Sequence, residues 1–141
     1  MKLTVLAVGK LRDAWLAEGC AEYERRVRAR LPLEIRELRE REDPVAKLPS
    51  RGRIWALDER GKQMSSEELA KALGDLMRSG EAGLTLVIGG ADGLGDEMRE
   101  RAHFVWSLSR LTLPHRLVRV VLLEQLYRAL SIIRGEPYHR A

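Results

Sequence analysis

A glycine-rich loop is the segment of this 141-residue chain best suited to holding a ligand. The loop Gly89–Gly95 (GGADGLG) follows an apolar run and precedes the start of a helix. In parallel α/β proteins such a loop lies at the carboxyl end of the sheet, where ligands bind, and glycine lets the backbone approach them closely. It has no Gly-Lys-Ser/Thr sequence, and it comes too late in the chain for a dinucleotide fingerprint. Asp92 would repel a phosphate, so we expect either a tight turn without a ligand or a site for a neutral or cationic nucleoside.

A second segment, Trp106–Pro114 (WSLSRLTLP), combines apolar residues with interleaved hydroxyls and closes on a proline. It is too short for a helix. It is consistent with an ordinary core strand. It is equally consistent with a loop whose backbone N–H and C=O groups read an adenine ring.

The three histidines are unequal candidates for a catalytic residue. His103 lies within an expected helix, and His115 follows Pro114 at the start of another. His139 lies beside Arg140 in the C-terminal tail and is the strongest candidate, although a solvated tail histidine would look the same. No spacing of His, Asp and Glu suggests a metal site, so we expect none. Cys20, the single cysteine, falls on the inward face of an expected helix, which makes it a poor nucleophile.

Charge is concentrated at the C-terminal end of the chain. The whole chain carries 25 basic and 21 acidic side chains, a net charge of +4, whereas residues 101–141 hold 7 basic and 2 acidic ones. Arg116 and Arg119 could contact phosphates there, or could simply form a solvated helix face. Arginine outnumbers lysine, which suits phosphate binding but also a GC-rich genome or a hot habitat. Without a signal-peptide layout or an apolar run of about 20 residues, we expect a cytoplasmic protein that does not enter membranes.

Hydrophobic periodicity predicts alternating strands and helices. Strands are expected at 2–9, 33–38, 53–58, 84–90 and 106–109, and helices at 11–31, from a capping box at Ser65 to about 80, at 96–105, and at 114–134. Residues 39–51 are expected to form a loop, with or without a short helix in it, and residues 59–64 are expected to form a loop. This order predicts an α/β fold with a mostly parallel sheet, and the absence of a linker predicts one domain over residues 1–141.

Five motifs, taken together, resemble one known family. They are LDERGK at 57–62, LVIGGADGL at 86–94, SLSRLTLPH at 107–115, VRVVLLEQLYRA at 118–129 and PYHR at 137–140. In this order they are similar to the ribosomal RNA large subunit methyltransferase H family, whose members are small SPOUT-class enzymes. The resemblance covers essentially the whole chain and is weakest at 39–51.

The resemblance implies a fold, a cofactor and partners. It implies a SPOUT-type parallel-sheet domain with helices on both faces and a C-terminal trefoil knot. It implies methylation of N3 of a pseudouridine in 23S ribosomal RNA on the assembled ribosome, by a homodimer with S-adenosyl-L-methionine as cofactor. The residues that it assigns to cofactor binding are Leu57, Gly89, Gly90, Ser109, Arg110, Leu111, Thr112, Leu113 and Pro114.

The tail motif supplies the expected catalytic residues. By the PYHR match, His139 would accept the N3 proton or orient the base, because imidazole exchanges protons near neutral pH. Arg140 would hold a phosphate or developing negative charge, and Tyr138 would stack on a base. Two alternatives stay open: a SPOUT methyltransferase that acts on transfer RNA, and a non-catalytic ribosome-binding module.

Overall fold

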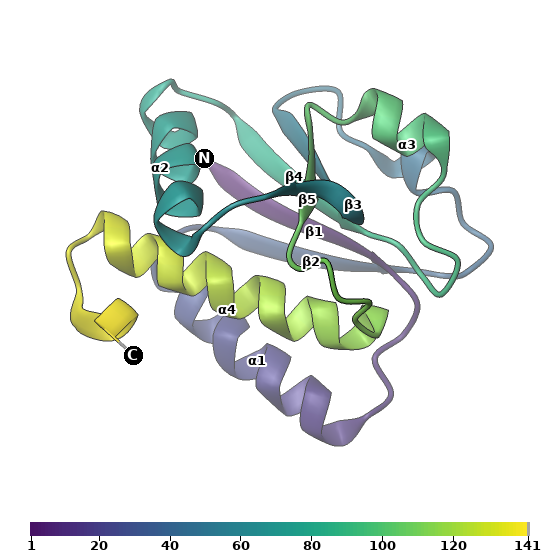
Figure 1. Cartoon of the computed structure of the whole chain (residues 1–141), viewed down its shortest axis with the longest axis horizontal. Coiled ribbons are helices and arrows are strands. Elements are labelled where there is room, and N and C mark those ends of the chain that lie inside the picture. Colours follow the sequence, from purple (N-terminus) through teal and green to yellow (C-terminus); the bar gives the residue numbers. More distant parts are fainter. Residues whose placement is uncertain (141) are drawn as a thin grey trace.

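The computed structural model describes residues 1–140, apart from the side chain of Arg140, and its centre is a parallel sheet of five strands (Figure 1). The strands pair in the order β2-β1-β4-β3-β5, and every pair is parallel. Apolar and β-branched residues fill the central strands, as expected for a sheet that is covered on both sides. The strands are β1 (Lys2–Val8), β2 (Leu33–Leu38), β3 (Arg53–Gln63), β4 (Gly83–Ile88) and β5 (Phe104–Ser107).

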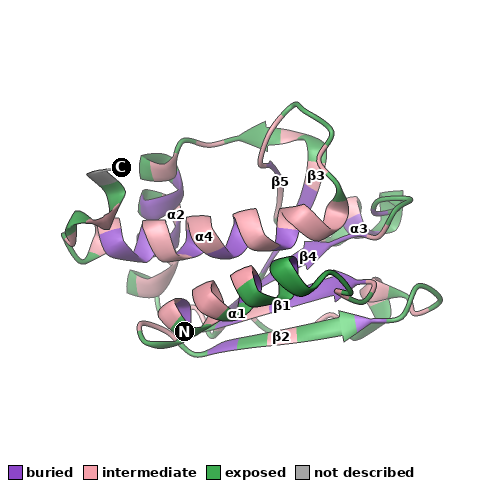
Figure 2. Cartoon of the chain, turned by 90° about the horizontal axis from the view of Figure 1, so that it is seen from below, coloured by how far each residue is buried: buried purple, intermediate pink, exposed green. Residues whose placement is uncertain are grey.

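Helices cover both faces of the sheet, as predicted. The first face carries α1 (Ala14–Arg28), α2 (Ser66–Arg78) and α4 (His115–Ile133), and α4 packs against both of the others. The second face carries the 3₁₀ turn η1 (Pro44–Lys47) and α3 (Asp96–Arg101). Side chains along each strand alternate between the two faces, so Leu3 and Val5 join the large core under α4, while Leu6 joins the small core under α3. In Figure 2 buried residues recur along α4 and colour much of β1 and β4, whereas the start of α1 is largely exposed.

Three elements differ from the sequence predictions: β3, α3 and β5. Residues 59–63 are not a loop, because β3 continues past an irregularity between Leu57 and Lys62 and pairs again with β5. Gly61 makes this possible, since a Cβ there would lie 2.5 Å from the carbonyl oxygen of Val105. The helix predicted at 96–105 ends at Arg101, because His103 already bonds to Ile54 through both its N–H and its Nδ1.

These bonds draw the next residues into the sheet two positions earlier than predicted. Phe104 and Trp106 then pack edge-on against Trp55, with ring centroids 5.5 Å and 5.9 Å away. The strand therefore spans 104–107 instead of 106–109. An isolated amphipathic pattern cannot reveal this, because the aromatic partner lies on a distant strand.

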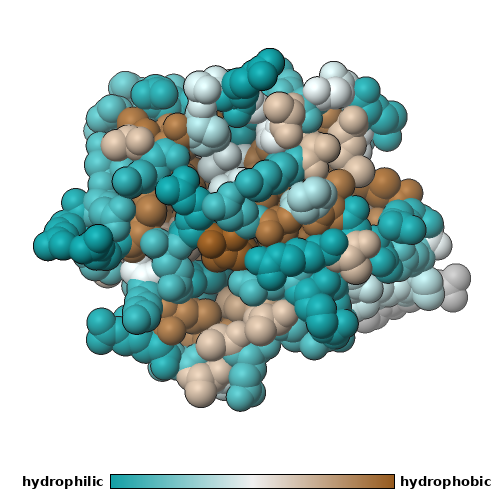
Figure 3. All heavy atoms as spheres, turned by 180° about the vertical axis from the view of Figure 1, so that it is seen from behind, coloured by the Kyte–Doolittle hydropathy of each residue, from teal (hydrophilic) through white to brown (hydrophobic). Residues whose placement is uncertain are grey.

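The other elements agree with the predictions to within a few residues. Ser65 forms the expected capping box with Glu68, and α4 follows Pro114 directly. No helix within residues 1–140 is long and apolar enough to cross a membrane. On the face shown in Figure 3, hydrophilic side chains dominate and apolar atoms form a narrow band.

Candidate functional site

A cavity of about 740 Å³ lies at the carboxyl ends of β3, β4 and β5. Three segments enclose it: the irregular part of β3 after Leu57, the glycine-rich loop after Ile88, and the segment Leu108–His115 that joins β5 to α4. These are the three segments that sequence reasoning singled out. Of the nine residues expected to bind the cofactor, eight line this cavity: Leu57, Gly89, Gly90, Ser109, Leu111, Thr112, Leu113 and Pro114.

The glycine-rich loop turns back on itself so tightly that side chains are excluded. Gly93 has a φ of +74° and its N–H donates to the carbonyl oxygen of Gly90 at 2.9 Å. A Cβ at Gly89 would lie 2.6 Å from the backbone carbon of Gly93. A Cβ at Gly90 would lie 2.9 Å from the Glu40 carboxylate and 3.1 Å from Val8. Glycine at these positions therefore brings bare backbone to the cavity wall.

The opposite wall is a loop stabilised by its own hydroxyls. Ser107 Oγ donates to the carbonyl oxygen of Ser109 at 2.8 Å, and the N–H of Leu111 donates to Ser109 Oγ at 3.0 Å. Leu111 is 72% exposed at the rim, which is unusual for a leucine. Arg110 is the ninth expected residue, and it does not line the main cavity; with Gln63, Ser109 and Leu111 it borders a shallow depression beside it.

An arginine that the sequence did not single out ties two of the loops together. Arg99 on α3 donates to Asp58 Oδ2 at 2.9 Å and to the carbonyl oxygen of Leu94 at 2.8 Å, and it also pairs with Asp96. Burial raises the pKa of Asp58, but hydrogen bonds from Arg60 and Arg99 outweigh that effect and hold the pKa below its usual value. Asp58 therefore stays ionised and fixes the end of the glycine-rich loop against β3.

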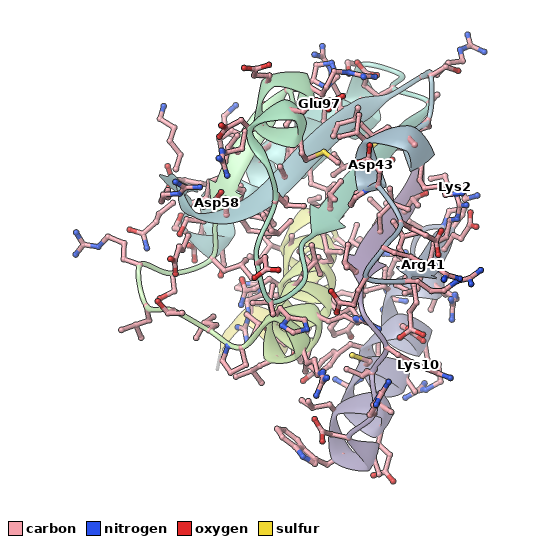
Figure 4. The ribbon with its side chains drawn as sticks, turned by 90° about the vertical axis from the view of Figure 1, so that its right-hand side faces the viewer. Lys2, Lys10, Arg41, Asp43, Asp58 and Glu97 are labelled. Atoms are coloured by element: carbon pink, nitrogen blue, oxygen red, sulfur yellow. The ribbon has the colours of Figure 1, made fainter. Side chains whose placement is uncertain are left out.

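Charges of both signs surround the cavity, and Arg60 and Arg99 lie among the carboxylates. Figure 4 looks onto this edge of the sheet, with Asp58 and Glu97 on the side of β3 and α3, and Lys10, Arg41 and Asp43 on the other side. Asp92 and Glu59 add two more exposed carboxylates to the first side. A ligand with positive charge is favoured beside these carboxylates.

The predicted phosphate contact at Arg119 is wrong. Its side chain is 5% exposed and donates to Glu37 Oε2 at 2.5 Å and to the carbonyl oxygen of Gly9 at 3.1 Å. Burial raises the pKa of Glu37, but the bonds from Arg119 and from the Leu11 N–H outweigh it and hold the pKa below its usual value. Arg119 thus anchors the end of β1 to α4 and is not available to RNA.

His115, which sequence reasoning set aside as a helix-end residue, lines the cavity. Its Nε2 lies 3.6 Å from where a Gly9 Cβ would stand, and Glu40 Oε1 lies 3.3 Å from the same point. Glu40 therefore reaches both Gly9 and Gly90 from the loop after β2. The weak match of residues 39–51 to the family gave no reason to place it there.

The tail residues lie away from the cavity of their own chain. The helix α4 has 19 residues and begins at the cavity, and the chain then turns at η2 (Pro137–Arg140) near the other end, about 28 Å along the axis (Figure 1). Tyr138 packs back against α1 and α4, and His139 is exposed. The side chain of Arg140 lies outside the described residues.

Other candidate groups are placed as follows. Cys20 is buried, and burial raises its pKa to about 11, so it is a poor nucleophile as expected. Within residues 1–140, no group of three or more His, Cys, Asp or Glu side chains is arranged to hold a metal ion.

Comparison with known proteins defines the class to which this fold and cavity belong. The family model described as "Predicted SPOUT methyltransferase" matches residues 1–139. A probable methylase family protein from Haemophilus influenzae superposes with a TM-score of 0.62 at 10% identity, over 96% of this chain and 69% of that one. A Legionella pneumophila structure, described as a methyltransferase in complex with the bound cofactor SAM, gives 0.54 at 11% identity, over 92% of this chain and 66% of that one. At these identities the two structures establish the fold alone.

Sequence relatives narrow the assignment. Proteins named "Ribosomal RNA large subunit methyltransferase H" from Geobacter metallireducens and from Geobacter sp. strain M21 are 44% and 47% identical to this chain. The first alignment covers all of both chains, and the second covers 99% of each. This chain therefore belongs to the SPOUT methyltransferases and, within them, to the ribosomal RNA large subunit methyltransferase H family.

Proposed function

We propose that this protein is an S-adenosylmethionine-dependent methyltransferase that acts in the cytoplasm on N3 of a pseudouridine in 23S ribosomal RNA, within the assembled ribosome. It works as a homodimer of single-domain subunits, and the three cavity loops belong to a trefoil knot. The observation that carries the proposal is the 740 Å³ cavity enclosed by three main-chain-rich loops in a chain of this family.

The cavity has the chemistry that S-adenosylmethionine requires. Its volume lies within the range of about 300–1,000 Å³ typical of small-molecule sites. Leu57, Ile88 and Leu113 offer an apolar surface for the adenine, and the glycine-rich loop offers bare backbone. Trp106, another lining residue, has a buried indole N–H without an acceptor in residues 1–140. The exposed carboxylates of Glu59 and Asp92 favour the positive charge of a sulfonium and an ammonium.

When bound, the cofactor supplies an electrophilic methyl group. The protein's own task is to place the acceptor nitrogen in line with that methyl group and to exclude water. The rigid turn at Gly90–Gly93 and the Ser109 loop fix the two walls between which the base enters. N3 of pseudouridine carries a proton, so a side chain must accept the proton or stabilise the anion.

We propose His139 as the group that accepts the N3 proton. Its position supports an active site to which both subunits of the dimer contribute. Within one chain, the tail folds against the α1–α4 face instead of the cavity. If a second subunit packed on that face, its tail would reach the cavity of the first subunit, and the tail of the first subunit would reach the cavity of the second. Arg140 from the same tail would then meet phosphate or the developing negative charge.

Mass spectrometry of the modified nucleotide tests this function. Wild-type protein is incubated with S-adenosylmethionine and either assembled 70S ribosomes, isolated 50S subunits or bulk transfer RNA. We expect one methylated pseudouridine, on 23S RNA and from ribosomes. Methylation of transfer RNA alone would support the other enzymatic alternative. Absence of any calorimetric heat with S-adenosylmethionine would leave the ribosome-binding module instead.

A matched pair of variants tests the role of His139. His139→Ala should lose most of its turnover while the dissociation constant for S-adenosylmethionine stays unchanged, because the tail does not line the cavity of its own chain. His139→Gln is the paired variant, because it keeps a polar side chain on the tail but cannot exchange the proton near neutral pH, so it should lose turnover as well. Full turnover by His139→Ala would remove this residue from the mechanism.

A further inference from the structure

The tail is held by two sets of contacts on the outer side of α1 and α4. The first set is an ion pair near the end of α4. Arg30 donates to both carboxylate oxygens of Glu136, at 3.1 Å and 2.8 Å, and Arg134 lies 3.2 Å from the same carboxylate. These contacts fix where the chain leaves the helix, three residues before His139.

The second set holds Tyr138 by its hydroxyl. This hydroxyl donates to Glu124 Oε2 at 2.9 Å, and the hydroxyl of Tyr23 lies 3.3 Å away, where it can donate in turn. Glu124 Oε2 also accepts two bonds from Arg128, at 3.0 Å and 2.8 Å. The other carboxylate oxygen, Oε1, accepts from Gln125 at 2.7 Å. Both oxygens of Glu124 are thus occupied, so its orientation is fixed.

The ring of Tyr138 is fixed as well. Its centroid lies 4.7 Å from that of Tyr127 in an edge-on arrangement. The guanidinium of Arg128 lies 5.0 Å from the centre of the Tyr138 ring, and that of Arg26 lies 6.0 Å from it. An RNA base could stack on a covered part of this ring only by displacing these contacts from two helices. The stacking role expected for Tyr138 from the tail motif therefore competes with its contacts within the chain.

The contrast with the next residue is sharp. Tyr138 is half-buried and its hydroxyl is hydrogen-bonded, whereas His139 is exposed and its imidazole makes no hydrogen bond in the described part of the chain. If the whole tail were solvated, the contacts around Tyr138 would have no purpose. If the tail must hold the His139 imidazole in a fixed place, the adjacent Tyr138 must itself be fixed.

We propose that Tyr138 and Glu124 are positioning residues, which hold the tail so that His139 is presented at a fixed place on the α1–α4 face. This proposal rests on the proposed function, because it takes His139 as the group that handles the N3 proton. It assigns to Tyr138 a role through His139 instead of a contact with RNA.

The test compares two hydroxyl deletions in one cluster. Tyr138→Phe removes the bond to Glu124 and keeps the ring. Tyr127→Phe is the matched control, because its hydroxyl makes no hydrogen bond in the described part of the chain while its ring has the same edge-on contact. We expect Tyr138→Phe to lower kcat about tenfold or more, as for the loss of a hydrogen bond to a charged group. Its KM for ribosomes and its cofactor affinity should stay within twofold, and Tyr127→Phe should match the wild type.

A double-mutant cycle separates positioning from other roles. In a His139→Ala background, Tyr138→Phe should cause no further loss, because there is no imidazole left to place. An equal loss in both backgrounds would overturn the proposal and indicate a structural role or a direct RNA contact. Glu124→Gln provides a second variant, which should lower kcat in the wild-type background and have no effect in the His139→Ala background. Thermal unfolding confirms that each variant is folded at the assay temperature.

The outcomes also distinguish this proposal from the function on which it rests. If wild-type protein methylates no RNA, the proposed function fails and the cycle has no signal. If wild type methylates ribosomes and His139→Ala does so equally well, the function stands and the positioning proposal falls. Unchanged kcat for Tyr138→Phe in an active enzyme would also overturn it.

Discussion

Replacing Gly89 by alanine should damage both the cofactor cavity and the stability of the protein. The added Cβ would lie 2.6 Å from the backbone carbon of Gly93, 2.8 Å from its oxygen and 3.0 Å from its Cα. Carbon atoms pack at about 3.5–4.0 Å, so the two arms of the glycine-rich loop must separate by about 1 Å. All three atoms are backbone, and no flexible side chain can give way instead.

Both effects have an expected size. Overpacking of this kind costs about 1–3 kcal/mol of unfolding free energy. For a domain of this length, that lowers Tm by about 4–12 °C. The displaced arm is a wall of the cavity, so the dissociation constant for S-adenosylmethionine should rise at least about tenfold, which corresponds to about 1.4 kcal/mol. Differential scanning calorimetry and isothermal titration calorimetry measure the two quantities separately.

Gly95→Ala is the matched control from the same loop. No heavy atom lies within 4 Å of its Cβ position, and its φ of −76° suits any residue. Gly95 is the N-cap of α3, so a loss of under about 1 kcal/mol is expected, with cofactor affinity unchanged. If Gly89→Ala bound the cofactor as tightly as Gly95→Ala does, the glycine-rich loop would not be the cavity wall proposed above.

Three further predictions follow from other contacts. Cys20 should resist Ellman's reagent at pH 8 in the native protein and react at once in denaturant, since burial raises its pKa to about 11; rapid native reaction would contradict the buried placement. Ser65→Ala should cost about 0.5–2 kcal/mol by chemical denaturation, because it removes the cap on Glu68 N–H; a loss near zero would mean that α2 does not depend on its cap. Burial raises the pKa of Glu37, but bonds from Arg119 and Leu11 outweigh burial and hold the pKa below 4.5. The ionised Glu37 therefore stabilises the folded state fully above pH 4.5, and this stabilisation is lost as the pH falls through the lower pKa of the folded state. The pH dependence of Tm between 7 and 3 should therefore be shallower in Glu37→Gln, and an identical slope would refute the assignment.

Local sequence pattern was sufficient for most of the fold. The strands at β1, β2 and β4 and the helices α2 and α4 follow from periodicity, caps and prolines, which are properties of neighbouring residues. The errors at β3 and β5 have a common cause, because both depend on the pairing of Trp55–Gln63 with Phe104–Ser107. Pairing between distant segments is not encoded in either segment alone.

The loops that line the cavity could also be predicted from local sequence. The residues that hold these loops in place could not. Gly89 and Ser109 lie in segments whose composition is already unusual, so they could be recognised as candidate ligand contacts. Arg99 and Glu40 look like ordinary charged residues of a helix and a loop, and only the fold brings them to the glycine-rich loop. The relation between the tail and the cavity could not be predicted either, because it depends on the direction and length of α4.

The structure shows which of the basic side chains near the C-terminus are free to contact RNA. Of the seven arginines in residues 101–141, three are engaged within the chain: Arg119 with Glu37, Arg128 with Glu124, and Arg134 with Glu136. The pairs of Arg119 and Arg128 are mostly buried and must be broken before either arginine can bind a phosphate, whereas Arg134 is 56% exposed in its pair. Among the described side chains of this segment, contact with RNA phosphate therefore falls to Arg101, Arg110, Arg116 and Arg134. Of these, Arg110 lies next to the exposed Leu111 at the rim of the cavity, so electrostatic attraction is directed to the loop that also forms the proposed cofactor wall.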